Sequence, residues 1–227
     1  MVAVIDSGIA RTPELANVVQ AEYDEAVTPG RAPFAPRYDH GTLVASILNR
    51  AANGAVDIIS FRIDDEAGCP AGAHPPCQAS AQVIAQAIDH AASLGVDAIN
   101  ISLALTDDPS IVAAVSRASQ RGITVVMAAG NNGRDYPDNV ASARSGYPRV
   151  ILVGATDKSG QPWTGTNRPQ PGETGYVYAW EQGVSVPAET AAGVAVTATG
   201  TSFATPIETA RRVLAAKPAG TALATAR

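Results

Sequence analysis

The sequence is poor in aromatic residues and in cysteine. Phenylalanine, tryptophan and tyrosine make up 5% of the 227 residues, and there are two cysteines. The core must therefore consist mainly of Ala, Val, Ile and Leu, small side chains that let helices pack closely on a sheet. No apolar run approaches the ~18 residues that a membrane-spanning helix needs. The length suits one domain with a sizeable core, and we expect a single domain over residues 1–227.

Positive charge is also scarce. The chain has 16 Lys and Arg against 21 Asp and Glu, and its formal net charge is −5. A nucleic-acid-binding domain carries a basic patch or stripe, and no basic run appears here, so we expect no nucleic-acid partner. The first residues, "MVAVID", have neither the basic region nor the cleavage site of a signal peptide.

The two cysteines flank a short segment, "CPAGAHPPC", from Cys69 to Cys77. A disulfide between them would stabilise the fold by about 2–3 kcal/mol in the chain-entropy model, and it would imply an oxidising compartment. The alternative is two free thiols, since the spacing is not that of a CxxC metal site. We favour the disulfide.

Strand-like and helix-like segments alternate along most of the chain. Continuous apolar runs predict strands at residues 2–5, 56–63, 96–104, 123–130 and 149–157, and helical spacing predicts helices at 40–52, 80–95 and 108–122. Asp108 is the expected N-cap of the last helix. Strands that are apolar on both faces indicate a mainly parallel sheet covered by helices on both sides. The expected fold class is α/β with three layers, α/β/α. Residues 131–146 read as a polar loop, and short strand-like pieces follow at residues 175–180 and 193–200.

Polar residues stand where ligands bind in such sheets, outside the carboxyl ends of the strands. Asp6 ends the first strand, Ser102 ends the third, and Asn131 follows the fourth. His40 and Ser202 each open a predicted helix. Alone, each has an ordinary structural explanation, such as a turn at the end of a strand or a helix cap.

The stretch "TATGTSFATP", from Thr197 to Pro206, can be explained as an ordinary helix start. Ser and Thr oxygens accept hydrogen bonds from the unpaired N–H groups at a helix start. Thr201 or Ser202 then simply opens a helix that runs toward Leu214. Pro206 is expected in its first turn, where a missing N–H costs little.

Taken together, these segments resemble the signature segments of the subtilisin-like serine proteases, the subtilases of peptidase family S8. "VAVIDSGI", "DHGTLVASI", "NISLA", "VVMAAGNNG", "YPRVILVGATD" and "GTSFATP" follow one another in the family's order. The sequence order of acid, histidine and serine is that of subtilisin. The resemblance runs from residue 2 to about 215, and it implies a subtilisin-like fold and a serine endopeptidase.

The resemblance implies a role for each of four residues. Ser202 is the expected nucleophile, and His40 is the base that takes its proton and returns it to the leaving group. Asp6 is expected to orient the imidazole and to stabilise its charged form. Asn131 corresponds to the side-chain amide of the oxyanion hole.

Other titratable residues near these motifs have structural interpretations. Asp39 is adjacent to His40, but neighbouring side chains point apart, so we expect it to start the helix. His90 lies in the middle of a predicted helix, and His74 lies between the cysteines. The acidic run Asp64–Glu66 could bind a cation, but a solvated loop is the expected interpretation.

The resemblance also implies two sets of substrate-binding residues. The first set is expected to pair with an extended peptide as an added strand: Ser102, Leu103 and Ala104. The second set is expected to form the wall of the primary specificity pocket: Ala128, Ala129 and Gly130. Residues 134–146 shape the same pocket. These residues include charges of both signs, so the sequence does not decide which substrate side chain is preferred: Arg134, Asp135, Asp138 and Arg144.

The chain departs from the family pattern at several points. Ala104 replaces a common Gly, and "WEQG" replaces the usual Ala-Pro-Gly before the serine. The calcium-binding loop after the histidine helix has no counterpart. We therefore expect no cofactor and no metal site, with a structural calcium ion left open. Glu208, Arg211 and Arg212 imply that the serine helix is partly solvated, or is covered by a propeptide or a partner chain.

The expected function is hydrolysis of a peptide or protein substrate through an acyl-enzyme on Ser202. One alternative is a subtilase-fold module that binds or scaffolds and hydrolyses weakly. Another is transfer of the acyl group to an amine, which would cyclise a peptide. The family's habit and the cysteine pair lead us to expect a secreted or periplasmic protein.

Overall fold

The computed structural model describes residues 1–27, 29–65, 67–71 and 76–216. Within them, seven strands form one sheet in the order β2-β3-β1-β4-β5-β6-β7, and every neighbouring pair is parallel. The strands are β1 (Val2–Asp6), β2 (Val19–Asp24), β3 (Ile58–Arg62), β4 (Ala98–Ile101), β5 (Thr124–Ala128), β6 (Val150–Thr156) and β7 (Val177–Gln182). His74 and Glu66 lie outside the described residues.

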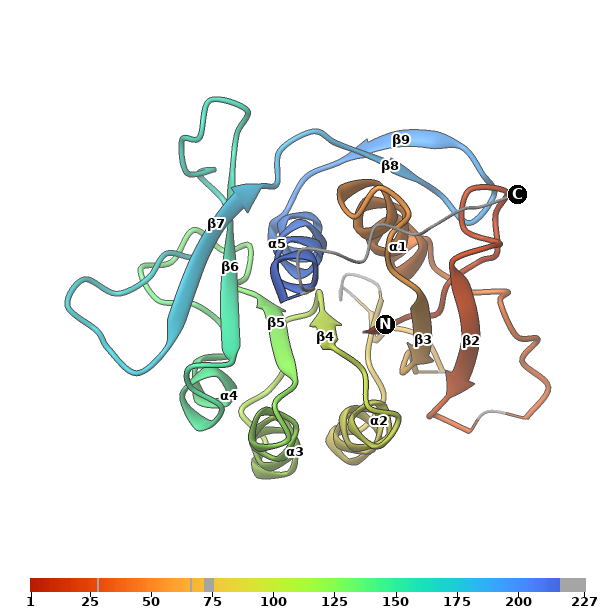
Figure 1. Cartoon of the computed structure of the whole chain (residues 1–227), viewed down its shortest axis with the longest axis horizontal. Helices are drawn as coiled ribbons and strands as arrows, with labels where there is room; N and C mark the ends of the chain where they lie inside the picture. The colour runs from red at the N-terminus through yellow and green to blue at the C-terminus, as the bar shows by residue number, and fades with distance from the viewer. Residues whose placement is uncertain (28, 66, 72–75, 217–227) are drawn as a thin grey trace.

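Helices cover both faces of this sheet (Figure 1). One face carries α1 (His40–Ala51) and α5 (Thr201–Ala216), and the other carries α2 (Ala81–Ser93), α3 (Pro109–Gln120) and α4 (Val140–Ser145). An antiparallel pair, β8 (Val186–Glu189) and β9 (Ala195–Ala198), packs against α1. The predicted three-layer α/β/α architecture is confirmed.

Alternation along the strands builds the core on both faces of the sheet. In β1, which is buried throughout, Ala3 and Ile5 join the cluster under α2 and α3. Val2 and Val4 join the cluster under α1 and α5. This two-sided burial explains why the central strands are continuous apolar runs in the sequence.

Of the two aspartates expected at helix starts, only Asp108 makes a capping hydrogen bond. Asp108 caps α3, since its Oδ1 accepts a hydrogen bond from the Ser110 N–H at 2.8 Å. Asp39 stands at the start of α1 as expected but makes no capping bond with that helix. Its carboxylate accepts instead from the Ala191 N–H at 2.8 Å, so it fixes the β8–β9 pair to the beginning of α1.

Three elements lie outside the predicted pattern. β2 is an edge strand with one fully buried residue, Val19, so it lacks the apolar run by which strands were identified. α4 has six residues inside the predicted polar loop. β8 is short and contains Pro187. Each is too short or too polar to produce a clear period.

Two sequence expectations are wrong. Pro206 does not lie in the first turn of α5, because the helix begins at Thr201 and continues through the proline. The helix therefore lacks the N–H that would bond the Ser202 carbonyl four residues earlier. Asp64 does not lie in a solvated loop: it is 2% exposed and pairs with both Arg31 and Arg62 at 2.9 Å.

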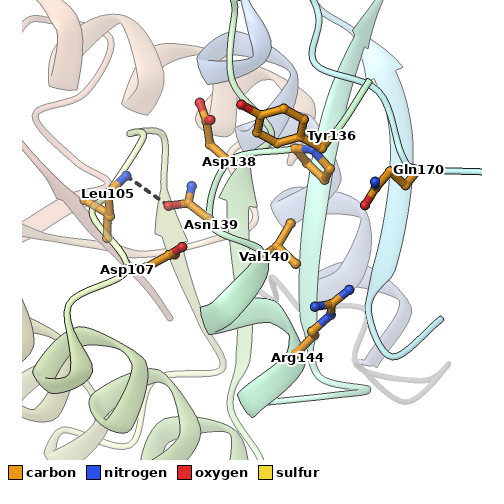
Figure 2. Close-up of a pocket in the computed structure, with 9 residues that line it drawn as sticks. Leu105, Asp107, Tyr136, Asp138, Asn139, Val140, Arg144 and Gln170 are labelled. Carbon is orange, nitrogen blue, oxygen red and sulfur yellow. Dashed lines mark hydrogen bonds between the residues drawn. The ribbon is translucent and has the colours of Figure 1, made fainter. Parts of the chain in front are cut away.

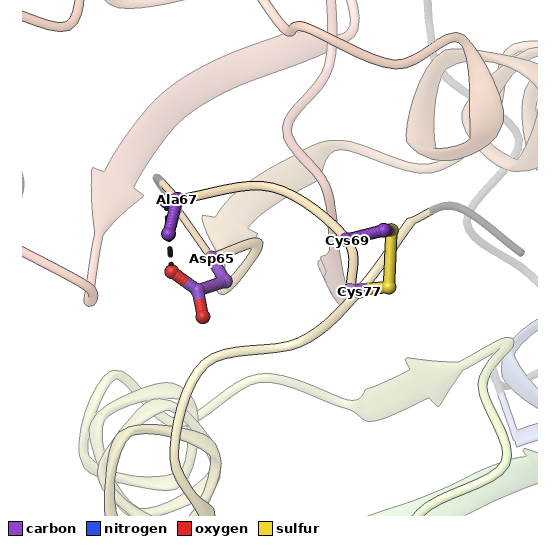
Figure 3. The surroundings of a disulfide bond; sticks show 4 residues. All are labelled: Asp65, Ala67, Cys69 and Cys77. Carbon is purple, nitrogen blue, oxygen red and sulfur yellow. Dashed lines mark hydrogen bonds between the residues drawn. A yellow bond between two sulfur atoms is a disulfide. The ribbon is translucent and has the colours of Figure 1, made fainter. Parts of the chain in front are cut away.

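A disulfide joins Cys69 and Cys77 beyond β3 (Figure 3). Two backbone contacts accompany it. The Asp65 N–H donates to the Cys77 carbonyl at 2.9 Å, and the Ala67 N–H donates to the Asp65 carboxylate at 2.9 Å. The segment is thus held by one covalent and two hydrogen-bonded links. The oxidising compartment that a disulfide implies stays a prediction.

Candidate active site

The carboxyl ends of three adjacent strands bring the predicted residues to one edge of the sheet. The strands β1, β4 and β5 are neighbours at its centre. Asp6 is the last residue of β1, Ser102 directly follows β4, and Asn131 lies three residues beyond β5. The strand order reverses beside β1, and such a switch point is where open parallel sheets bind ligands.

Asp6 and His40 are in contact. The Nδ1 atom of His40 lies 2.8 Å from Asp6 Oδ1 and 3.0 Å from Oδ2. Asp6 is 1% exposed, and its Oδ1 also accepts from the Ser7 N–H at 2.7 Å. The carboxylate is therefore fixed from both sides, which leaves the Nε2 atom of His40 as the free end of the imidazole.

The close approach of α1 to the turn after β1 depends on a glycine. A Cβ atom at Gly41 would lie 2.3 Å from the carbonyl oxygen of Gly8. No real side chain fits at that distance, so only glycine lets the first turn of α1 carry His40 against Asp6.

Asp6 also sets the charge state of the imidazole. Burial of the ring works against its charged form, but the charge of Asp6 and the hydrogen bond to it outweigh this effect. Together they raise the pKa of His40 above its ordinary value. An imidazole in this setting is a stronger base than a free histidine.

Ser202 lies in the first turn of α5 and is 9% exposed. Its hydroxyl donates to the carbonyl oxygen of Ser102 at 2.7 Å. Among the described residues it makes no hydrogen bond with His40, so the hydroxyl must turn before an imidazole can take its proton. The ring centroids of the next residue, Phe203, and of His40 lie 5.6 Å apart, so the start of α5 lies beside the imidazole.

Asn131 is held by the same helix start. Its Oδ1 accepts from the Thr201 N–H at 2.8 Å and from the Thr201 hydroxyl at 2.9 Å. The exposed Nδ2 end makes no hydrogen bond to any described residue, so it is free to donate. Gly200 has a φ of +150°, and a Cβ there would lie 3.4 Å from the Asn131 amide. The Gly-Thr-Ser sequence thus fixes the amide and keeps its approach open.

A buried chain of polar side chains supports Ser102. The Asn100 Nδ2 donates to the Ser102 hydroxyl at 3.0 Å, and the Thr209 hydroxyl donates to the side-chain Oδ1 of Asn100 at 2.9 Å. All three residues are fully buried. They join β4 to α5, so the strand end and the serine helix keep a fixed distance. Sequence reasoning missed Asn100, which stands in an otherwise apolar strand.

Asn139 joins the two expected substrate-binding segments. Its Nδ2 donates to the carbonyls of Leu103 at 3.0 Å and Ala128 at 2.9 Å. Its Oδ1 accepts from the Leu105 N–H at 2.9 Å. The residue is 4% exposed and has a φ of +63°, a conformation that Asn tolerates better than most residues. Sequence reasoning missed it too, because an Asn inside a predicted polar loop looks like an ordinary turn residue.

The charges on α5 are satisfied within the chain. Glu208 is fully buried, and its carboxylate accepts from Arg211 and Arg212 at 2.7 Å each. Glu181 lies beside it, where burial, the Glu208 carboxyl and its charge raise the pKa of Glu181 despite Arg211. Coverage of this helix by another chain stays a prediction.

Metal-ligating clusters and membrane-spanning helices are both missing from the part of the chain that the structure describes. Within those ranges, no three His, Cys, Asp or Glu side chains are grouped so that they could hold a metal ion. The helices of the same ranges are all too short or too polar to cross a membrane.

The chain is similar to known proteases along most of its length. The family model of the subtilases, Peptidase_S8, matches residues 1–218. Mycosin-1 of Mycobacterium tuberculosis is 32% identical over 205 residues, covering 71% of this chain and 45% of that protein. The minor extracellular protease Epr of Bacillus subtilis is 29% identical over 169 residues, covering 70% of this chain and 24% of Epr. This chain thus spans less than half the length of these two relatives.

A solved structure extends the likeness to three dimensions. A serine-to-alanine mutant of the protease domain of PatA is 27% identical to this chain, with a TM-score of 0.73. The match covers 92% of this chain and 76% of that one.

Proposed function

Because the chain belongs to the subtilase family, we propose that it is a serine endopeptidase that hydrolyses peptide or protein substrates through an acyl-enzyme on Ser202. The observation that carries the proposal is the contact of His40 with the buried Asp6 carboxylate, 2.8 Å away, beside the start of α5. In this proposal His40 is the base, Asp6 its orienting carboxylate and Ser202 the attacking alcohol. In addition, residues 1–227 are proposed to form one catalytic domain.

Each side chain has a definite task in the proposed reaction. His40 takes the proton of the Ser202 hydroxyl as the oxygen attacks the peptide carbonyl, and then gives it to the leaving amine. Asp6 holds the imidazole in the tautomer with its proton on Nδ1. Water then attacks the acyl-enzyme with the same base, which releases the acid and restores Ser202.

The developing oxyanion needs donors that are fixed in advance. The Nδ2 group of Asn131 and the Ser202 N–H are proposed to supply them. Thr201 keeps Asn131 oriented through its N–H and hydroxyl, so little reorganisation is needed when the charge appears. In subtilisin, a member of the same family, loss of the equivalent side-chain donor costs about 10²–10³ in turnover.

The proposed chemistry needs no cofactor, and a peptide is the proposed partner. A secreted or periplasmic location is proposed from the disulfide and from Epr, which is named as an extracellular protease. A structural calcium ion is not required by the mechanism.

Labelling with a fluorophosphonate probe tests the proposal, since the probe reacts with activated serines. The wild-type chain should be labelled, and Ser202→Ala should not be. Ser93→Ala is the matched control, because Ser93 is exposed on α2 and should leave labelling intact. A folded wild type without labelling would favour a binding module. Mass analysis of products with and without an added amine separates hydrolysis from acyl transfer.

A further inference from the structure

The structure distinguishes among the charged residues near the expected specificity pocket. Arg144 pairs with Glu173. The Arg134 guanidinium lies 5.6 Å from the centre of the Tyr136 ring, and both residues are exposed. Asp135 is exposed as well. Asp138 alone of the four is partly buried, so it is the one charge that the fold turns inward.

Asp138 lies against the wall of the pocket. Its N–H donates to the Ala129 carbonyl at 2.8 Å, which places it beside the segment from Ala128 to Gly130. A Cβ atom on Gly130 would lie 2.1 Å from the Asp138 Oδ2, and Gly130 has a φ of +100°. Glycine is therefore required at 130 for two reasons: the positive φ disfavours other residues, and a side chain would collide with this carboxylate.

Asp138 also lines a cavity of about 300 Å³ between the segment after β4 and the segment before α4. Figure 2 shows Asn139 between Asp138 and Asp107, with Arg144 on α4. Within the described part of the chain, neither Asp107 nor Asp138 takes part in an ion pair or accepts a hydrogen bond. The cavity is thus lined by two carboxylates that form no ion pair with a described residue, and by Arg144, which is paired with Glu173.

The electrostatics agree with that geometry. Burial raises the pKa of the Asp138 carboxyl; the charge of Arg134 opposes this, and the charge of Asp107 adds to it. A partly buried carboxylate with a second one nearby gains most from a cation that enters the cavity.

A buried amide lies beside Asp138 on its Gly130 side, behind the residues that line the cavity. Asn167 is fully buried, and its Oδ1 accepts from the N–H groups of Asn132 and Arg134 at 3.0 and 3.1 Å. Its Nδ2 has no hydrogen-bond partner within the described residues. That Nδ2 lies 2.3 Å from the position of a Cβ on Gly130, next to the Asp138 oxygen. The buried neighbour of the Asp138 carboxylate on this side is therefore an amide donor and not a cation.

We propose that this cavity binds the side chain of arginine or lysine directly before the scissile bond, with Asp138 as its main partner and Asp107 at the rim. The inference rests on the proposed function, because it names the substrate class of the same site. A guanidinium or ammonium group supplies several donors to the two carboxylates, and charge-assisted bonds of this kind are among the strongest in proteins. The preference comes from residues 107 and 138, both outside the catalytic residues.

Matched peptides test the inference. Four substrates differ only before the scissile bond, where they carry Arg, Lys, citrulline or Leu, and kcat/KM is measured for each. Citrulline has nearly the shape of arginine without its charge. We expect Arg and Lys to exceed citrulline and Leu by at least tenfold. Asp138→Asn should reduce the ratio of Arg to citrulline by about 10–100-fold. Asp57→Asn changes an exposed carboxylate before β3 and should leave that ratio unchanged.

A second measurement separates this inference from the proposed function. Calorimetry on Ser202→Ala compares peptides that end in Arg and in Leu, so it needs no turnover. Tighter binding of the Arg peptide, lost in Ser202→Ala/Asp138→Asn, supports the inference even where fluorophosphonate labels nothing. A labelled enzyme that prefers Leu, or an Asp138→Asn variant that keeps the full Arg preference, overturns the inference and leaves the proposed function standing.

Discussion

The Ser202 hydroxyl donates to the Ser102 carbonyl oxygen, 2.7 Å away. That carbonyl belongs to the segment expected to pair with substrate as an added strand. A peptide N–H that bonds to the same oxygen competes with the hydroxyl. In the proposed reaction, substrate pairing would then release the Ser202 proton toward His40, and one acceptor atom would couple binding to activation of the proposed nucleophile.

The pH dependence of labelling should report His40. The imidazole must be neutral to accept a proton, and its pKa is raised above the ordinary value of 6.5. The fluorophosphonate labelling rate should therefore fall as the pH drops through a value above 6.5. Asp6→Asn removes the charge that raises this pKa, so the fall should move to lower pH, and the rate should drop by up to about 10⁴.

Asp39→Asn is the control for that experiment. Asp39 is adjacent to His40, but its carboxylate bonds to the Ala191 N–H, so the pH profile should keep its midpoint. Equal profiles for the wild type and Asp6→Asn would remove Asp6 from the mechanism.

Gly41→Ala should disturb the site from within the fold. The new Cβ would meet the Gly8 carbonyl at 2.3 Å, so the first turn of α1 must move. We expect a loss of about 1–3 kcal/mol in the free energy of unfolding by urea, together with at least tenfold slower labelling. Gly122→Ala is the comparison: Gly122 has a φ of +86° and open space around it. It should lose about 1–2 kcal/mol and keep its labelling rate.

Asn139→Ala should weaken substrate binding. The change removes three hydrogen bonds that Asn139 makes with Leu103, Leu105 and Ala128. Each is worth about 1 kcal/mol, and buried unpaired groups cost more, so we expect a loss of about 2–4 kcal/mol in unfolding free energy. KM should rise more than kcat falls. Asn132→Ala, an exposed neighbour that uses its backbone rather than its side chain, is the control. Unchanged KM in Asn139→Ala would contradict this role.

The Cys69–Cys77 disulfide should be detectable by thiol counting. The unfolded chain should show no free thiol before reduction and two after it. Reduction should lower the unfolding free energy by about 2–3 kcal/mol, since the loop is short. Cys69→Ser/Cys77→Ser should match the reduced protein; a variant as stable as the oxidised wild type would mean that the bridge contributes little to stability.

Sequence reasoning found the parts of the fold that depend on local pattern. The central strands are apolar on both faces, so β1, β3, β4, β5 and β6 were all predicted, as were the long helices α1, α2 and α3. β2 was missed because this edge strand fully buries only one side chain, and β8 was missed because four residues are too few to show a hydrophobic period. Pro206 was placed in the wrong turn because the helix start is set by Asn131, a residue distant in sequence.

The same distinction holds for the candidate site. Asp6, His40 and Asn131 stand in recognisable motifs. Asn100, Asn139 and Asn167 do not, because their importance comes from partners far along the chain. An amide in a loop looks like a turn residue until the fold shows which carbonyls it meets. Asp138 was named among four charges, and only its burial separates it from the others.

Asn139 matters for engineering of the proposed specificity. Because one buried amide joins Leu103 to Ala128, the two expected substrate-binding segments are connected independently of the charged residues proposed to select the substrate. Residues 134–138 can then be exchanged to alter the preferred peptide while the spacing of the two segments is retained. An engineer who wants new selectivity from this scaffold should keep position 139 and randomise residues 134–138 except Pro137, which is buried.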